Sequence, residues 1–287
     1  MRCLLVVNPV AGAGRAVAAA PGVAAVLRAA GWETTSACSA DMEDAKRLAA
    51  EAASESRAVI VLGGDGTASQ VAPMVSEHGG VLGVLPGGRG NDFVRALGWP
   101  TDPLRAVRRM VCADPLATDL GWAGEHPFLT VASVGFDSKV IEEAARLPKW
   151  LGRGVYAAAA LRCLKSWRHV DFHLTLDGAP SQVSGWTVAA SNGGVYGGGM
   201  RIAPDAGLDD GLLDVVTLSK SSRAHMLLGM PKVFFGAHLS DPIFSLQRAQ
   251  QLQIRSEAPL VLYAAGEPAG ELPARIWVQA GAVRVLR

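Results

Sequence analysis

The segment VLGGDGT carries the residue types with the clearest chemical potential in the sequence. Gly63, Gly64 and Gly66 follow an apolar run, and glycine at such a turn lets backbone approach a ligand where a Cβ atom would collide. A loop that leaves a strand and opens a helix points N–H groups at its ligand, which favours phosphate. Asp65 interrupts this pattern, because its carboxylate would repel phosphate. A divalent cation such as Mg²⁺ between the two groups resolves the conflict.

The same residues also fit a simpler structure, a tight turn in which Asp65 caps the following helix. Thr67 adds a hydroxyl at the predicted helix start in either case. The loop alone therefore leaves two interpretations open, a site for a metal–nucleotide complex and a helix cap.

Two further glycine-rich segments, NPVAGAGR and LPGGRGNDF, also follow apolar runs. Neither matches the dinucleotide-binding G-x-G-x-x-G pattern or the Walker G-K-[ST] loop. Three glycine-rich turns at one edge of a sheet nevertheless predict a nucleotide cradle, and an arginine in one of them can reach phosphate as a fixed cation. The candidate residues that these two segments add are Asn8, Gly12, Gly14, Arg15, Gly88 and Asn91.

The elements that must position these loops alternate between strand and helix over the first 115 or so residues. CLLVV, AVIVL and GVLGVLP are continuous apolar runs, typical of strands buried on both faces. Helical stretches separate and follow them, with Asp41 and Asp102 as predicted N-caps. This alternation predicts a parallel sheet with helices on its faces. Ligands of such sheets bind at the carboxyl ends of the strands, where all three loops fall.

Beyond residue 120 the pattern changes to short, turn-bounded β-rich runs such as FLTVASVGF, GWTVAASN and LLDVVTL. Asp177 and Gly178 form a hairpin signal. Two helical stretches interrupt the runs, one near residues 138–167 and one near residues 221–237. We expect a second, antiparallel domain, with the functional cleft between the two.

Length and composition limit the classes of protein to which the chain can belong. The chain has 287 residues, enough for two domains that each bury a core. Hydrophobic residues make up 49%, charged residues 18%, and the net charge is +1, which disfavours disorder and a nucleic-acid surface. No run reaches about 18 apolar residues, and the N-terminal apolar run of about five is shorter than a signal-peptide core. We therefore expect a cytoplasmic protein.

Four scattered cysteines, at positions 3, 38, 112 and 163, lack the spacing of a zinc site or a disulfide framework. They are predicted to be buried thiols. His225 and His238 have no partner that the sequence identifies, and a structural role is expected for both.

The motifs NPVAGAG, VLGGDGT, LPGGRGNDFVRALG, SNGGVYGGGMRIAPDAGLDDGLLDVV and GEPAGELPARIWVQAGAVRVLR together resemble the bacterial diacylglycerol kinase family of lipid kinases, nearly end to end. G-G-D-G-T is shared with NAD kinases, whereas the glycine run with D-D-G is more specific. The resemblance implies an α/β nucleotide domain over residues 1–120 and a β-sandwich over residues 121–279. Residues from about 280 to 287 would return to the first domain, and ATP would bind between the domains.

Site residues also follow from the resemblance. It implies nucleotide and Mg²⁺ contacts at Asn8, Gly64, Asp65, Gly66, Thr67 and Asn91. It also implies a structural metal loop at residues 207–212, bound by the Asp210 carboxylate and by the carbonyls of Gly207 and Leu212. The segment DAGLDDG has the carboxylates and flexible backbone of a hard-cation loop, but a solvated hairpin has the same composition.

The sequence departs from the family at one position. Members usually carry Asp-Gly-Glu near the C-terminus, with the aspartate as base toward the acceptor hydroxyl, and here Ala265 precedes Gly266 and Glu267. A natural relative with altered catalysis, an engineered inactivation and a misplaced register all fit this difference. A general base contributes about 10²- to 10⁴-fold, so its loss could leave weak activity. Glu267 is a substitute candidate.

The expected function is therefore ATP- and Mg²⁺-dependent phosphorylation of a lipid hydroxyl, of diacylglycerol or a related lipid, within phospholipid metabolism. The alternatives are a nucleotide- or lipid-sensing module and a small-molecule kinase similar to NAD kinase. Two apolar and basic stretches, residues 147–164 and 225–239, suit either a peripheral membrane surface or ordinary core. A homodimer remains open.

Overall fold

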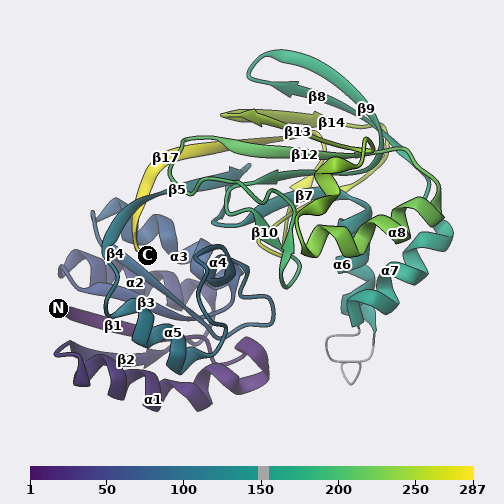
Figure 1. The fold of residues 1–287 in the computed structure, drawn as a ribbon. Coiled ribbons are helices and arrows are strands. Elements are labelled where there is room, and N and C mark those ends of the chain that lie inside the picture. The colour runs from purple at the N-terminus through teal and green to yellow at the C-terminus, as the bar shows by residue number, and fades with distance from the viewer. Residues whose placement is uncertain (148–154) are drawn as a thin grey trace.

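The computed structural model describes residues 1–147 and 155–287 (Figure 1). Its first region is a parallel sheet in the order β2-β1-β3-β4. Helices cover both faces, with α1 against α5 on one side and α2 against α3 on the other. The bounds are β1 (Arg2–Val7), α1 (Arg15–Ala29), β2 (Glu33–Cys38), α2 (Met42–Ser54), β3 (Ala58–Gly63), α3 (Asp65–Glu77), β4 (Val81–Pro86), α4 (Asp92–Ala96) and α5 (Pro103–Met110), with a short 3-10 turn η1 (Ala11–Gly14) before α1.

Local chemistry accounts for these elements. All six residues of β3 are buried, as its unbroken apolar run predicts. The side chain of Asp41 accepts a hydrogen bond from the Asp44 amide (2.8 Å) and begins α2, and Asp102 accepts one from the Arg105 amide (2.8 Å) and begins α5. The predicted N-caps are therefore confirmed.

The second region is antiparallel and places its strands in the order β16-β15-β7-β9-β8-β14-β17, with β12 and β13 extending from β9. One face of β7, β9 and β12 packs inside the sandwich, and the other face packs under helices. The bounds are β5 (Pro115–Ala123), β6 (His126–Phe128), β7 (Val131–Gly135), β8 (Val170–Leu176), β9 (Ala179–Ser191), β10 (Val195–Tyr196), β11 (Met200–Arg201), β12 (Leu213–Ser219), β13 (Phe244–Ala249), β14 (Gln251–Arg255), β15 (Val261–Ala264), β16 (Glu267–Glu271) and β17 (Ala274–Leu286).

The helices of this region gather at one end of the sandwich (Figure 1). They are α6 (Phe136–Arg146), α7 (Val155–Ser166) and α8 (Arg223–Phe234), with the short 3-10 turn η3 (Ala237–Ser240) after α8. The sequence predicted one helical stretch over residues 138–167, but α6 ends at Arg146 because Leu147 is extended. The segment 148–154 of that prediction lies outside the described residues.

The last strand joins the two regions. β17 pairs antiparallel with β14 and β5, and its end runs parallel to β4, where Arg284 faces Val81 and Val285 faces Leu82. A continuous hydrogen-bonded strand therefore spans both regions and holds the loops of the first against the hairpins of the second. Among the described residues, none of the helices is long and apolar enough to cross a bilayer.

The cysteine prediction was wrong in part. Cys3 is buried in β1 and Cys163 is half-buried, whereas Cys38 and Cys112 are exposed. Cys38 ends the edge strand β2 and Cys112 lies in the turn after α5, where no neighbouring element covers them.

Candidate functional site

Three glycine loops meet backbone to backbone at the carboxyl ends of β1, β3 and β4. The amide of Gly87 donates to the carbonyl of Gly63 (2.8 Å). A Cβ atom at Gly88 would lie 2.7 Å from the Gly64 Cα, and one at Gly12 would lie 2.4 Å from the Gly87 carbonyl oxygen. Because backbone atoms cannot move aside, these contacts require glycine. The loops thus form one packed unit.

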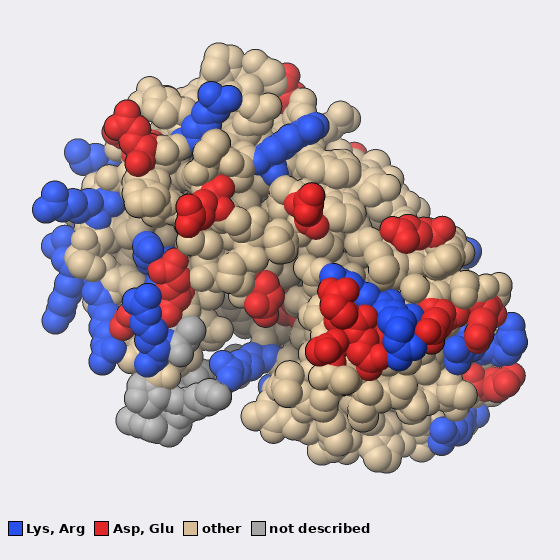
Figure 2. Space-filling view, turned by 180° about the vertical axis from the view of Figure 1, so that it is seen from behind, with Lys and Arg blue, Asp and Glu red and all other residues tan. Residues whose placement is uncertain are grey.

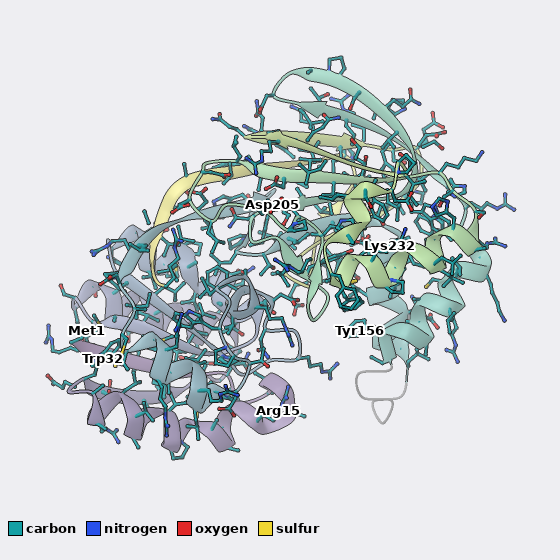
Figure 3. The ribbon with its side chains drawn as sticks, viewed as in Figure 1. Met1, Arg15, Trp32, Tyr156, Asp205 and Lys232 are labelled. Carbon is teal, nitrogen blue, oxygen red and sulfur yellow. The ribbon has the colours of Figure 1, made fainter. Side chains whose placement is uncertain are left out.

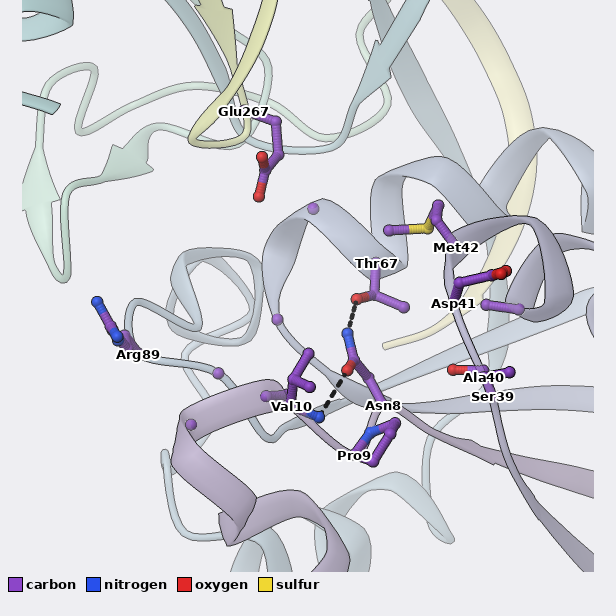
Figure 4. A pocket seen from close by; sticks show the side chains of 16 residues that line it. Asn8, Pro9, Val10, Ser39, Ala40, Asp41, Met42, Thr67, Arg89 and Glu267 are labelled. Carbon is purple, nitrogen blue, oxygen red and sulfur yellow. Dashed lines mark hydrogen bonds between the residues drawn. The ribbon is translucent and has the colours of Figure 1, made fainter. Parts of the chain in front are cut away.

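A cleft of about 390 Å³ opens beside this unit (Figure 4). Its walls come from the ends of β1 to β4 and the starts of α2 and α3, and Glu267 of β16 closes it from the second region. The volume suits a small-molecule ligand. The lining residues are Asn8, Pro9, Val10, Ala11, Gly12, Ser39, Ala40, Asp41, Met42, Ala45, Gly64, Gly66, Thr67, Gly88, Arg89 and Glu267.

Some of the predicted site residues support the loops around the cleft and do not contact its interior. The Arg15 guanidinium donates to the carbonyls of Gly12 (3.1 Å) and Gly88 (2.6 Å), and the Asn91 side chain pairs with both backbone groups of Gly88. Asn91 adopts a left-handed conformation, φ 53°, which asparagine tolerates well. These two side chains therefore fix the shape of the loops. Gly14, φ 89°, makes the turn into α1.

Two polar side chains inside the cleft are linked to each other. Asn8 Nδ2 donates to Thr67 Oγ1 (2.8 Å), and Asn8 Oδ1 accepts from the Val10 amide (3.1 Å), as Figure 4 shows. This holds the Thr67 hydroxyl at the first turn of α3, where the free N–H groups of the helix favour an anion.

The Asp65 carboxylate lies beneath the cleft, next to a second carboxylate. Asp65 Oδ1 accepts from the Phe93 amide (2.9 Å), and both carboxylate oxygens of Asp92 accept from the Gly198 amide (3.0 and 3.1 Å). Burial raises the pKa of Asp65, and burial followed by the Asp65 charge raises the pKa of Asp92 to about 6. Two adjacent buried carboxylates favour a shared proton or a bound cation. The donor set fits Mg²⁺, which commonly uses one or two carboxylates.

This raised pKa predicts that the metal-free protein loses stability as the pH rises from about 4 to about 7. The ordinary pKa of 3.8 applies to Asp92 in the unfolded chain, so between 3.8 and about 6 the folded chain binds more protons. The free energy of unfolding then falls with rising pH. Thermal melts should show this decline as several degrees in Tm, and Asp92→Asn should make it clearly smaller, because only the buried Asp65 carboxyl would then remain. Identical pH profiles for both proteins would contradict the pairing.

The hairpin between β15 and β16 lies over the first turn of α3. Ala265 and Gly266 both have positive φ, 49° and 84°, as in a type I′ turn. The Ala265 amide donates to the Val131 carbonyl (3.0 Å), and its own carbonyl oxygen lies 3.9 Å from where a Cβ of Gly66 would be. Cγ of Glu267 lies 3.3 Å from the same point. The backbone carbonyl of Ala265 and the side chain of Glu267 therefore lie next to the start of α3.

The loop 207–212 lies apart from the cleft, at the junction of the two regions. Asp210 Oδ1 accepts from the Leu212 amide (3.0 Å), and a Cβ at Gly207 would lie 2.7 Å from Asp210 Oδ2. Buried Asp119 ties the loop down, because its carboxylate accepts from the amides of Gly211 (2.7 Å) and Gly281 (2.6 Å). Within the described ranges no three acidic, His or Cys side chains form a metal cluster, so a cation here would rest on Asp210, backbone carbonyls and water.

A structural metal at this loop predicts that Asp210→Ala lowers Tm by several degrees in Mg²⁺ and leaves Asp65-dependent nucleotide binding intact. Asp209→Ala is the matched control, because Asp209 lies in the same loop and also loses an arginine partner, Arg287, as Asp210 loses Arg248 (3.9 Å). Melts with and without Mg²⁺ measure the difference. Equal Mg²⁺ responses in both variants would show a solvated turn.

Four residues of the site or its surroundings had no individual role assigned from the sequence. Arg89 lines the cleft, Asp92 pairs with Asp65, and Asp119 braces the loop 207–212. Asp137, just after β7, accepts from the Thr187 hydroxyl (3.1 Å), but its Oδ2 is buried with no partner in the described structure. Burial raises the pKa of Asp137. Arg89 and Asp92 had a signal, because both lie in the glycine loop LPGGRGNDF, whereas Asp119 and Asp137 had none.

The two histidines have structural partners. His225 pairs with Asp241 (2.8 Å), and buried His238 contacts the Ile202 carbonyl (2.9 Å).

Comparisons with known proteins agree with this geometry. Residues 2–123 match the diacylglycerol kinase catalytic domain family, and residues 130–287 match the YegS C-terminal NAD kinase beta sandwich-like domain. The chain belongs to the diacylglycerol kinase family. The predicted resemblance and the two-part fold, α/β followed by an antiparallel β-sandwich, are thus confirmed.

Individual relatives cover most of the chain. A diacylglycerol kinase of Mycobacterium tuberculosis strain H37Rv is 38% identical over 98% of this chain and 93% of its own length. A probable lipid kinase YegS-like protein of Chromohalobacter salexigens is 31% identical over 78% and 74%. The crystal structure of a diacylglycerol kinase from Bacillus anthracis superposes with a TM-score of 0.78 at 25% identity, over 99% and 96%. This chain is therefore a member of a lipid kinase family.

Proposed function

We propose that this family member transfers the γ-phosphate of ATP to a hydroxyl of diacylglycerol or a related lipid, with Mg²⁺ bound. The observation that carries the proposal is the convergence of three glycine loops and the start of α3 on one cleft, lined by Gly64 and Gly66 on either side of Asp65, with Asp92 next to Asp65. Backbone N–H groups there suit phosphates, and the carboxylates below suit the cation that accompanies them.

Phosphoryl transfer depends mainly on positioning and on neutralising charge. Gly64 and Gly66 line the cleft and would bring backbone N–H groups to the phosphates, and the Asn8–Thr67 bond holds a hydroxyl in the same cleft. Bound Mg²⁺ would supply the charge neutralisation, held by Asp65 and Asp92. Arg15 and Asn91 hydrogen-bond to the loop backbone and hold the loops in place, and their side chains do not line the cleft.

The hairpin β15–β16, which lies where the acceptor hydroxyl would approach, carries fewer groups that could take part in the reaction. Ala265 carries no proton acceptor at the hairpin tip that faces α3, so the acceptor hydroxyl must lose its proton to another group. Glu267 is the one described carboxylate of the hairpin β15–β16 that lines the cleft. We propose that it accepts this proton, and the expected consequence is slow transfer, because a misplaced base forfeits part of the roughly 10²- to 10⁴-fold of general-base catalysis.

The specific observation of Ala265 also supports a second candidate, a sensing module that binds nucleotide or lipid without transfer. The nucleotide loops are complete in this chain, so binding would persist while turnover is lost.

The test is transfer from radiolabelled ATP to a panel of acceptors. Diacylglycerol, a sphingoid base and NAD are each supplied in detergent micelles or buffer, with Mg²⁺ or with EDTA. We expect slow, Mg²⁺-dependent labelling of diacylglycerol. Labelling of NAD alone would favour a small-molecule kinase, and ATP binding by calorimetry without any labelling would favour the sensing module.

A further inference from the structure

Helix α8 is apolar on both of its faces. Its inner face carries Met226 and Val233, which pack on the cluster around Trp186. Its outer face should be polar in a protein that exposes it only to water. Instead Leu228 is 77% exposed, and Phe235, directly after the helix, is 80% exposed.

The exposed apolar side chains are concentrated at the end of the molecule that carries α7 and α8. Of the eleven exposed large hydrophobic side chains among the described residues, six lie on α7, α8 and the residue after α8. Figure 3 shows Tyr156 of α7 and Lys232 of α8 at this end, across from Arg15 of the first region. Clustered exposure of this kind marks an interaction surface. The six are Tyr156, Leu161, Leu227, Leu228, Phe234 and Phe235.

The charged residues within the two segments that form this surface are all basic. Residues 155–168 and 220–240 contain six Lys or Arg and no Asp or Glu. The ends of α7 and α8 are adjacent, because the Arg223 guanidinium donates to the Lys165 carbonyl (3.1 Å). Figure 2 is turned by 180° from Figure 1, so its left side carries α7 and α8, and several basic residues lie along that edge with a few acidic ones between them. The six are Arg162, Lys165, Arg168, Lys220, Arg223 and Lys232.

Only part of this charge is compensated. Arg162 pairs with Glu143 (3.1 Å), and Lys232 lies 3.6 Å from Asp241. In the part of the chain that the structure describes, the other four cations form no ion pair. The surface thus combines exposed aliphatic and aromatic side chains with uncompensated positive charge.

We propose that the outer face of α8, with the basic end of α7, docks the protein on an anionic lipid bilayer. This inference rests on the proposed function, which requires a substrate that resides in a bilayer. A basic helix with exposed Leu and Phe inserts its apolar side chains at the headgroup boundary and holds anionic lipids with its cations. A second copy of the chain fits less well, because a two-fold contact would face this surface with its own positive charge.

The test measures sedimentation of the full chain with vesicles of phosphatidylglycerol and phosphatidylcholine. The variant Leu228→Glu/Phe235→Glu should reduce the vesicle-bound fraction about 10-fold or more, since it replaces membrane-inserted groups with charges that anionic lipid repels. Leu116→Glu is the matched control, an exposed leucine of β5 at 44%, and should bind as the unmodified chain does. Vesicles of phosphatidylcholine alone should bind weakly.

Two further readouts separate the explanations. Phosphorylation of diacylglycerol in detergent micelles should be the same for the variant and the unmodified chain, which shows that the site is intact. Failure of the unmodified chain to bind anionic vesicles overturns the docking proposal whatever the micelle result, and vesicle binding without lipid phosphorylation overturns only the proposed function. A dimer in light scattering that the variant abolishes assigns the surface to a second copy and also overturns the proposal.

Discussion

Replacing Asp65 by asparagine is expected to reduce Mg²⁺-dependent phosphoryl transfer about 10²- to 10³-fold, the cost typical of removing one preorganised electrostatic group. The physical reason is the pair that Asp65 forms with Asp92 below the phosphate loops. Removing one charge leaves the cation a single buried carboxylate. The substituted side chain keeps an oxygen that can accept from the Phe93 amide, as Asp65 does at 2.9 Å, so the loop should keep its shape. Calorimetry of ATP binding with Mg²⁺ and with EDTA, together with the transfer rate, measures the effect.

The control is Asp102→Asn, which removes a carboxylate of the same region that caps α5 outside the cleft. It should leave Mg²⁺ dependence unchanged, because asparagine also caps helices. ATP affinity that responds to EDTA equally in Asp65→Asn and in the unmodified chain would reject the bridging cation. The loop would then be the helix-opening turn that its sequence also allowed.

The placement of the three loops could be predicted because it follows from periodicity. Apolar runs buried on both faces indicate parallel strands, and the ends of parallel strands meet at one sheet edge. The roles within the loops could not be predicted. Arg15 and Asn91 look like ligand contacts in a linear sequence, but their hydrogen bonds go to the Gly88 backbone. That outcome depends on how closely loops distant in sequence pack.

Contacts between the two regions of the fold could not be predicted from the sequence for the same reason. Asp92 becomes significant only because the left-handed turn at Asn91 sets it beside Asp65, and its other partner, Gly198, is 106 residues away. Asp119 lies in an ordinary strand pattern, yet it accepts hydrogen bonds from two glycine amides of different segments. The local periodicity of a sequence gives no information about pairing between residues so far apart in the chain.

Replacing Ala265 by aspartate is expected to raise lipid phosphorylation by the part of the roughly 10²- to 10⁴-fold of general-base catalysis that Glu267 does not supply, with little change in nucleotide affinity. The hairpin tip already faces the start of α3, and its amide is anchored on Val131. The backbone supports the change as well. A type I′ turn needs positive φ at both central residues, and Asp-Gly is a preferred pair there, whereas alanine at φ 49° is strained.

The same turn geometry makes Ala265→Asn a closely matched control. Asparagine relieves the left-handed strain as well as aspartate does, so both variants should gain a similar few tenths of a kcal/mol up to about 1 kcal/mol in stability. Only aspartate adds a carboxylate that can take the proton of an acceptor hydroxyl, so only Ala265→Asp should gain rate. Melting curves establish that the stability gains match before the rates are compared. An equal rate gain with both substitutions would trace the defect to turn packing, and a gain with neither would favour the sensing module.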